Sequence, residues 1–167
     1  MSGAVAQGYA TVTSNDGVSS ACPSEGALLS PGNIDYFILN NFALVSLHDA
    51  ALAAKSVVTS FHGHGPTYSY WSGCSKGGRQ GMMFGNGIIP FRNLRYYYNT
   101  VKELDPDVHG FYRLFEVPGL QHCARGVGGY PAGTFDALVQ WVENGIVSDA
   151  LEAVSPTKRT TFFRKRM

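Results

Sequence analysis

Residues 73–77 read Gly-Cys-Ser-Lys-Gly and fit the pattern G-x-S-x-G. In hydrolases this pattern forms a sharp turn from a strand into a helix and exposes the serine as a nucleophile. Residues 66–71 before it are rich in strand-forming types, and the glycine-rich residues 77–81 after it let a helix begin close against that strand. The pattern therefore predicts a strand, a tight turn that carries Ser75, and a helix.

Alone, the pattern is weak, because the chain has 20 glycines among its 167 residues and an ordinary glycine-rich turn fits it too. The cysteines make it more specific. Cys74 precedes Ser75, and the potential base His122 is followed directly by Cys123. A disulfide between Cys74 and Cys123 would clamp Ser75 and His122 together, which favours a catalytic interpretation over a chance turn.

Length and composition limit the class of protein. A chain of 167 residues is one domain by the usual length relation, and 44% hydrophobic with 15% charged residues indicates a globular fold. The net charge of +1 argues against nucleic acid as a partner. Basic residues gather after residue 157, where we expect a solvated tail.

Three cysteines leave Cys22 unpaired if Cys74 and Cys123 are joined. A structural disulfide implies an oxidising compartment. Residues 1–7 have neither a basic region nor a long apolar core, so we expect no signal peptide. No apolar run approaches the roughly 20 residues that span a bilayer, so we also expect no membrane partner.

Hydrophobic periodicity and turn residues predict alternating strands and helices. The expected strands are 8–13, 66–71 and 110–117. The expected helices are 36–61, a short one after the turn that runs to about residue 84, one after Pro90 that includes residues 96–104, and 135–144 with Thr134 as its N-cap and Gly145 as its stop. Such alternation predicts a mostly parallel α/β sheet.

A serine hydroxyl is a poor nucleophile until a base removes its proton, and imidazole is the side chain best suited to that task. Ser75 and His122 fill these roles, with His122 in a loop after a strand. A triad also needs a carboxylate, which α/β-hydrolases place between the two in the chain and after a strand. The acidic residues in that interval do not follow a strand: Glu103, Asp105, Asp107 and Glu116.

The oxyanion that forms during acyl transfer needs two N–H donors. We expect the backbone N–H of Lys76 to supply one, and the residues before Gly8 hold no HGGG-like stretch from which to expect the second. His62 and His64 resemble a metal pair, but no acidic or cysteine ligand joins them, so a surface loop is the better interpretation and no metal site is expected. Cys74 as a thiol nucleophile is disfavoured because Cys123 offers it a partner.

Taken together, several segments resemble the tannase and feruloyl esterase family over most of residues 8–146. They are residues 8–10 (GYA), 53–55 (AAK), 68–81 (YSYWSGCSKGGRQG), 111–119 (FYRLFEVPG), His122 with Cys123, and 135–145 (FDALVQWVENG). The resemblance implies a secreted α/β-hydrolase that cleaves carboxylic esters of plant phenolic acids, and a disulfide between Cys74 and Cys123 beneath the serine and the histidine.

The chain departs from the family between Ser75 and His122. Family members carry further core strands there and a lid domain with a calcium ion, and this chain has room for one helix and one strand. The family's triad aspartate lies in a Gly-x-x-Asp-x-x-Ile-Pro segment, and aligning Ile89 and Pro90 with it puts Asn86 at the aspartate position. An internal deletion near residues 83–86 explains these departures. From the same comparison we expect the family's signal peptide and upstream glycine-rich segment to be missing as well.

We therefore expect a truncated α/β-hydrolase fold with a mostly parallel sheet and no lid. Residues 1–150 form a partial catalytic domain and residues 151–167 a basic tail; no cofactor is expected, and the calcium site is deleted. The leading hypothesis is a serine carboxylesterase impaired by Asn86. The alternatives are a non-catalytic remnant that at most binds phenolic ligands, and a structural module with a chance G-x-S-x-G.

Overall fold

The computed structural model describes residues 2–15, 27–74, 77–78, 91–122, 126–154 and 161–165, the side chains of 2, 91–93 and 161–165 excepted. The chain forms two compact units, Met1–Tyr70 and Trp71–Met167. The boundary falls just before the G-x-S-x-G segment, so all the candidate catalytic residues belong to the second unit.

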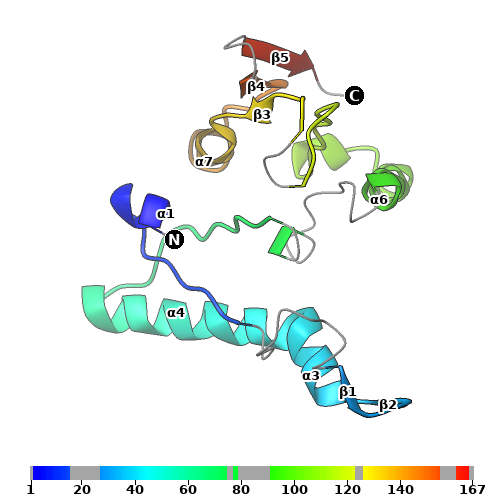
Figure 1. Ribbon diagram of the computed structural model, residues 1–167. Helices are drawn as coiled ribbons and strands as arrows, with labels where there is room; N and C mark the ends of the chain where they lie inside the picture. The colour runs from blue at the N-terminus through cyan, green and yellow to red at the C-terminus, as the bar shows by residue number, and fades with distance from the viewer. Residues whose placement is uncertain are drawn as a thin grey trace. The chain divides into compact units, whose positions relative to one another are not determined.

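The first unit is mainly one long helical run (Figure 1). Its elements are α1 (Ser2–Ala6), β1 (Leu28–Ser30), β2 (Asn33–Ile34), α3 (Tyr36–Asn40), the π-helical turn η1 (Asn41–Val45) and α4 (Ser46–His62). Asp35 begins the run, because its Oδ1 accepts a hydrogen bond of 3.0 Å from the N–H of Ile38. Gly63, with φ of 77°, ends it in the left-handed conformation. The helix expected over residues 36–61 is therefore confirmed.

This run, Tyr36–His62, is 27 residues long and has an 18-residue window of mean hydropathy 1.3, none of which is buried. Our expectation that no apolar segment reaches membrane-spanning length was therefore wrong. Large apolar side chains such as Phe37 and Phe61 are 77% and 82% exposed. Length and composition of this kind also occur in core helices and leader sequences, so they assign no membrane to this chain.

In the second unit the described residues form two longer helices and one sheet (Figure 1). Its elements are α6 (Phe91–Leu104), the 3-10 turn η2 (Val108–Gly110), β3 (Tyr130–Pro131), α7 (Thr134–Asn144), β4 (Ala150–Val154) and β5 (Thr161–Lys165). Gly145, with φ of 68°, ends α7 as expected, whereas Gly133 and not Thr134 is its N-cap residue. Residues 151–167, expected as a tail, contain most of β4 and all of β5.

The expected mostly parallel sheet is not found among the described residues. The first unit has the two-stranded sheet β1-β2 and the second has the three-stranded sheet β3-β4-β5, and all their pairings are antiparallel. Residues 9–13, 68–71 and 112–117, each expected to be a strand, have no ladder. A β-strand is defined by its hydrogen bonds to a neighbouring strand. Hydrophobic periodicity indicates which face of a segment is buried, but it does not show whether a neighbouring strand is present.

The fully or nearly buried apolar residues among those described are Tyr98, Val108 and Ala153, at 5%, 0% and 5% exposure. Tyr98 packs edge to face on Tyr112, with ring centroids 5.2 Å apart. Burial raises the pKa of Tyr112, and the neighbouring Tyr97 and Tyr98 add to that rise. This small core joins α6 and η2 to the extended residues that lead to His122.

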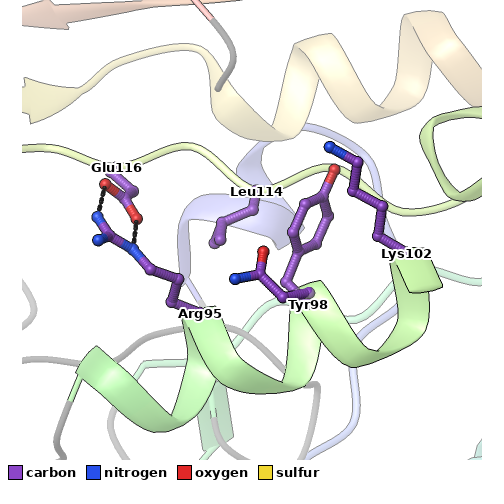
Figure 2. Close-up of a pocket in the computed structure, with 6 residues that line it drawn as sticks. Arg95, Tyr98, Lys102, Leu114 and Glu116 are labelled. Carbon is purple, nitrogen blue, oxygen red and sulfur yellow. Dashed lines mark hydrogen bonds and ion pairs between the residues drawn. The ribbon is translucent and has the colours of Figure 1, made fainter.

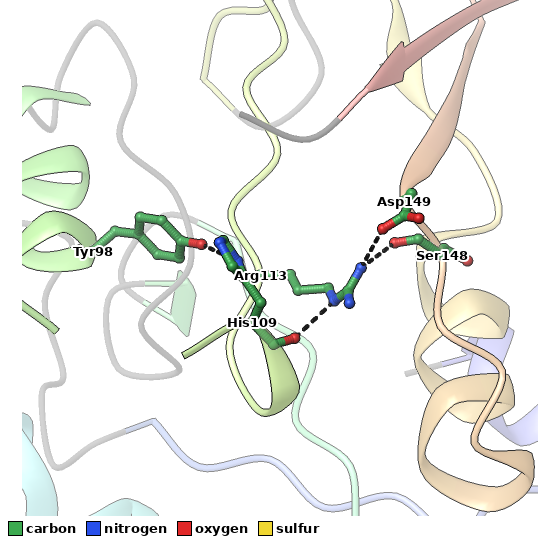
Figure 3. A network of polar contacts seen from close by, with 5 residues as sticks. All are labelled: Tyr98, His109, Arg113, Ser148 and Asp149. Carbon is green, nitrogen blue, oxygen red and sulfur yellow. Dashed lines mark hydrogen bonds and ion pairs between the residues drawn. The ribbon is translucent and has the colours of Figure 1, made fainter. Parts of the chain in front are cut away.

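Arg113 ties this extended segment to two other parts of the unit (Figure 3). Its guanidinium donates to the carbonyl of His109 at 3.1 Å, to the carbonyl of Ser148 at 3.0 Å and to the carboxylate of Asp149 at 2.9 Å. It also lies 5.2 Å from the ring centroid of Trp141. Because the Arg113 side chain is only 10% exposed, these contacts form in a poorly hydrated place.

We expect Arg113→Met to lower the free energy of unfolding by about 2 kcal/mol, since hydrogen bonds from a charged donor contribute about 1.5–3 kcal/mol and methionine keeps most of the volume. Urea unfolding followed by circular dichroism measures the change. Lys102→Met, which removes a cation from an exposed side chain, is the control and should change stability by less than about 0.5 kcal/mol. Equal effects of the two substitutions would contradict the role of Arg113.

Candidate active site

The backbone around the G-x-S-x-G segment approaches itself very closely. A Cβ at Gly73 would lie 2.4 Å from the carbonyl carbon and oxygen of Gly77 and 2.8 Å from the nitrogen of Gly78. Gly77 and Gly78 adopt helical conformation, and Gly78 is buried. The indole N–H of Trp71 donates to the Gly77 carbonyl at 2.9 Å. Ser75 and Lys76 lie outside the described residues, and the residues on either side of them make the tight turn that the pattern predicts.

His122 lies in a loop that glycines close. Leu120 and Gly126 form an isolated antiparallel bridge, and the N–H of Gly128 donates to the carbonyl of Gly119 at 2.8 Å. A Cβ at Gly126 would lie 2.3 Å from the Gly119 oxygen, and one at Gly128 would lie 2.3 Å from the Leu120 nitrogen. Sequence analysis placed His122 in a loop but missed this closure, which the Gly-Val-Gly-Gly run at 126–129 could have indicated.

The Nδ1 atom of His122 is buried and has no hydrogen-bond partner in the described part of the chain. In a serine hydrolase the triad carboxylate accepts a hydrogen bond from this ring nitrogen when Nε2 faces the serine. A buried polar atom without a partner is uncommon and costs about 1–3 kcal/mol. Asn86, which the sequence analysis expects at the carboxylate position, lies outside the described residues.

None of the four acidic residues considered for this place contacts His122 in the hydrogen bonds described. Glu116 accepts two hydrogen bonds from Arg95, at 2.8 and 2.6 Å (Figure 2). This hydrogen bonding, and then the opposite charge, raises the pKa of Arg95. Asp105 accepts from the N–H of Asp107 at 2.9 Å, which makes a local turn, and Glu103 is exposed near the end of α6.

Cys74 is a disulfide cysteine in the structure. The other cysteines of the chain, Cys22 and Cys123, both lie outside the described residues, so the pairing of Cys74 with Cys123 stays a prediction. A disulfide removes Cys74 as a thiol nucleophile, in agreement with the sequence analysis.

His62 is the last residue of α4 and His64 follows the Gly63 cap, with the two ring centroids 6.3 Å apart. His64 Nδ1 lies 3.1 Å from the carbonyl oxygen of Gly65. In the part of the chain open to description, no group of three or more histidine, cysteine or acidic side chains is placed to hold a metal ion.

Comparison with known proteins shows to which family the chain belongs. A model of the family described as tannase and feruloyl esterase matches the chain in two parts, over residues 1–86 and 86–167. The chain belongs to the tannase and feruloyl esterase family. The resemblance found from the motifs is thereby confirmed, and with it an α/β-hydrolase-like lineage of ester hydrolases.

Curated relatives of this family member include a probable feruloyl esterase of Arthroderma benhamiae, 40% identical over 85 residues. A mono(2-hydroxyethyl) terephthalate hydrolase of Piscinibacter sakaiensis is 36% identical over 84 residues, and feruloyl esterase B of Aspergillus niger is 35% identical over 82 residues. These matches cover 50%, 49% and 46% of this chain, and 16%, 14% and 13% of the relatives. The chain thus matches only a small part of each relative.

Proposed function

We propose that the chain derives from a serine carboxylesterase for esters of phenolic acids, such as feruloyl or galloyl esters, and that its own turnover is strongly impaired. The observation that carries this proposal is the tight G-x-S-x-G turn together with a histidine loop whose Nδ1 lacks its partner. The names of the relatives support an aromatic ester as substrate, since they include feruloyl esterases and a terephthalate monoester hydrolase.

In the proposed mechanism the Ser75 hydroxyl oxygen attacks the ester carbonyl carbon, and His122 Nε2 takes the serine proton. The backbone N–H of Lys76 donates to the oxyanion. His122 then gives the proton to the leaving alcohol, which leaves an acyl group on Ser75. Water, activated by the same imidazole, releases the phenolic acid. No step uses a cofactor.

The impairment follows from the charge that His122 must carry. When Nε2 takes the serine proton, the Nδ1–H needs an acceptor, and none is present among the described residues. An asparagine at the aspartate position holds the wrong tautomer, which in the serine-protease template lowers kcat about 10⁴-fold. The two family matches meet at residue 86, which supports our interpretation that a deletion displaced the aspartate there.

Two further features belong to the proposal. A disulfide between Cys74 and Cys123 would fix the serine loop against the histidine loop, as it does in the family. Because such disulfides persist in oxidising compartments, we propose secretion for the protein.

If the disulfide fixes the two loops, incubation with dithiothreitol should abolish whatever activity the oxidised protein has. Activity that survives full reduction of Cys74 would contradict this role of the disulfide.

The test is hydrolysis of methyl ferulate and methyl gallate by the purified chain. We expect a rate at least about 10⁴-fold below that of an esterase with a complete triad, and Ser75→Ala should remove it entirely. Ser72→Ala, at an exposed serine outside the motif, is the matched control and should leave the rate unchanged. A rate that persists in Ser75→Ala would refute Ser75 as the nucleophile.

A non-catalytic remnant is the second candidate, and the orphaned Nδ1 of His122 favours it as well. A remnant binds methyl ferulate without cleaving it, so titration would show binding that Ser75→Ala does not change. Detectable turnover that depends on Ser75 excludes this candidate.

A further inference from the structure

The indole ring of Trp71 links the two sides of the G-x-S-x-G segment. Its N–H donates to the carbonyl oxygen of Gly77 at 2.9 Å. A Cβ at Gly77 would lie 4.0 Å from Cζ2 of the same ring, so the ring also lies along the backbone of this glycine. The bond joins residues six positions apart, and the interval between them contains Ser75 and Lys76.

The backbone on both sides of Ser75 is rich in glycine. The glycines concerned are Gly73, Gly77 and Gly78. Glycine loses more conformational freedom on folding than any other residue, so an ordered turn of this composition needs restraints from outside its own backbone. The disulfide at Cys74 restrains the segment before Ser75, and the hydrogen bond from Trp71 restrains the segment after it.

Trp71 does not belong to the core of its unit. Its side chain is 39% exposed, whereas the apolar residues that are buried in the described part of the chain are Tyr98, Val108 and Ala153. A large aromatic residue that stays partly at the surface gains less from burial than a core residue does. The contact of Trp71 with Gly77 is therefore local and acts on the turn.

We propose that Trp71 is a positioning residue for the nucleophile turn. Its indole N–H fixes the Gly77 carbonyl and thereby holds the Ser75 hydroxyl and the Lys76 N–H in their working orientation. The catalytic consequence rests on the proposed function, in which these two groups are the nucleophile and an oxyanion donor. A misplacement of about 1 Å can lower an enzymatic rate about 10²-fold, so a restraint on the turn affects the reaction although Trp71 itself acts only through the backbone.

The test removes the indole N–H and keeps the shape of the ring. The sequence has two tryptophans, so in a Trp141→Phe chain every tryptophan is Trp71 and can be replaced by 3-benzothienylalanine, which carries sulfur in place of the N–H. We expect labelling of Ser75 by a fluorophosphonate to slow about fivefold, the factor that corresponds to one ordinary hydrogen bond. NMR order parameters for the amides of residues 75–78 should fall from about 0.85 toward 0.6.

The matched control is the Trp141→Phe chain with ordinary tryptophan, which should label like the original chain. In the original chain, reaction of Ser75 with the label should also shift the indole N–H signal of Trp71 and leave that of Trp141 in place. Unchanged order parameters, a stationary Trp71 signal, or labelling as fast as in the control would each overturn the proposal. If no chain is labelled at Ser75, the proposed function fails instead, and the order parameters alone decide whether Trp71 orders the turn.

Discussion

Gly128→Ala is expected to lower the free energy of unfolding by about 3 kcal/mol and to displace the loop that carries His122. The new Cβ would lie 2.3 Å from the nitrogen of Leu120 and 2.4 Å from the carbonyl oxygen of Pro118. Both neighbours are backbone atoms, so no side-chain rotation relieves the overlap. The hydrogen bond from Gly128 to the Gly119 carbonyl must break, and the strand-like closure of the loop with it.

Urea unfolding measures the stability of this variant, and the NMR signals of the His122 ring report the loop. Gly110→Ala is the matched control, because a Cβ at Gly110 meets nothing within 4 Å and should change stability by less than about 0.5 kcal/mol. A Gly128→Ala variant as stable as Gly110→Ala, with unchanged His122 signals, would show that the loop is not closed by these glycines.

Asn86→Asp is expected to raise the rate of methyl ferulate hydrolysis by about 10²- to 10⁴-fold. A carboxylate at this position would accept the hydrogen bond that His122 Nδ1 lacks, hold the productive tautomer and stabilise the imidazolium. The upper figure is the effect of the reverse change in the serine-protease template, and the lower allows for incomplete restoration of the triad geometry.

The rate is measured with saturating ester and compared with Asn86→Ala and with Asn40→Asp. Asn86→Ala adds no hydrogen-bond acceptor. Asn40→Asp makes the same chemical change at an exposed site of α3 in the other unit. Neither variant should hydrolyse the ester faster than the original chain. If Asn86→Asp hydrolyses the ester no faster than the original chain, residue 86 does not occupy the aspartate position.

Local features of the fold could be predicted from the sequence because local chemistry determines them. The run Tyr36–His62 followed from apolar spacing without internal glycine or proline, and its end from Gly63. The close turn at Gly73 followed from the G-x-S-x-G pattern. These features need only neighbours along the chain, which the sequence displays directly.

Features that depend on distant partners could not be predicted in the same way. Residues 112–117 have the composition of a buried strand, yet their backbone pairs with no strand among the described residues. Residues after 150 read as a basic tail, but β5 pairs with β4 from Lys165 opposite Ala150 to Thr161 opposite Val154. The contacts of Arg113 with Ser148 and Asp149 join residues that are 35 and 36 positions apart in the sequence, so no local sequence pattern predicts them.

In the candidate site too, local features could be predicted from the sequence and features that depend on distant partners could not. Ser75 and His122 could be proposed from their motifs, and the orphaned Nδ1 of His122 agrees with an interval that offers no well-placed acid. The ion pair between Glu116 and Arg95 could be found only in the structure, because no sequence pattern relates those two positions. Under our proposal the chain keeps the nucleophile turn and the histidine loop of the family and has lost the carboxylate that supports the histidine.

The most direct test of this account is labelling of the chain by a fluorophosphonate, with the modified residue identified by peptide mass spectrometry. Attack on phosphorus needs the serine and its base but neither lid nor substrate pocket. We predict slow labelling at Ser75, faster labelling in Asn86→Asp, and none in Ser75→Ala. Labelling at another residue, or none at Ser75 even in Asn86→Asp, would contradict the claim that Ser75 and His122 are an esterase pair that lacks its carboxylate.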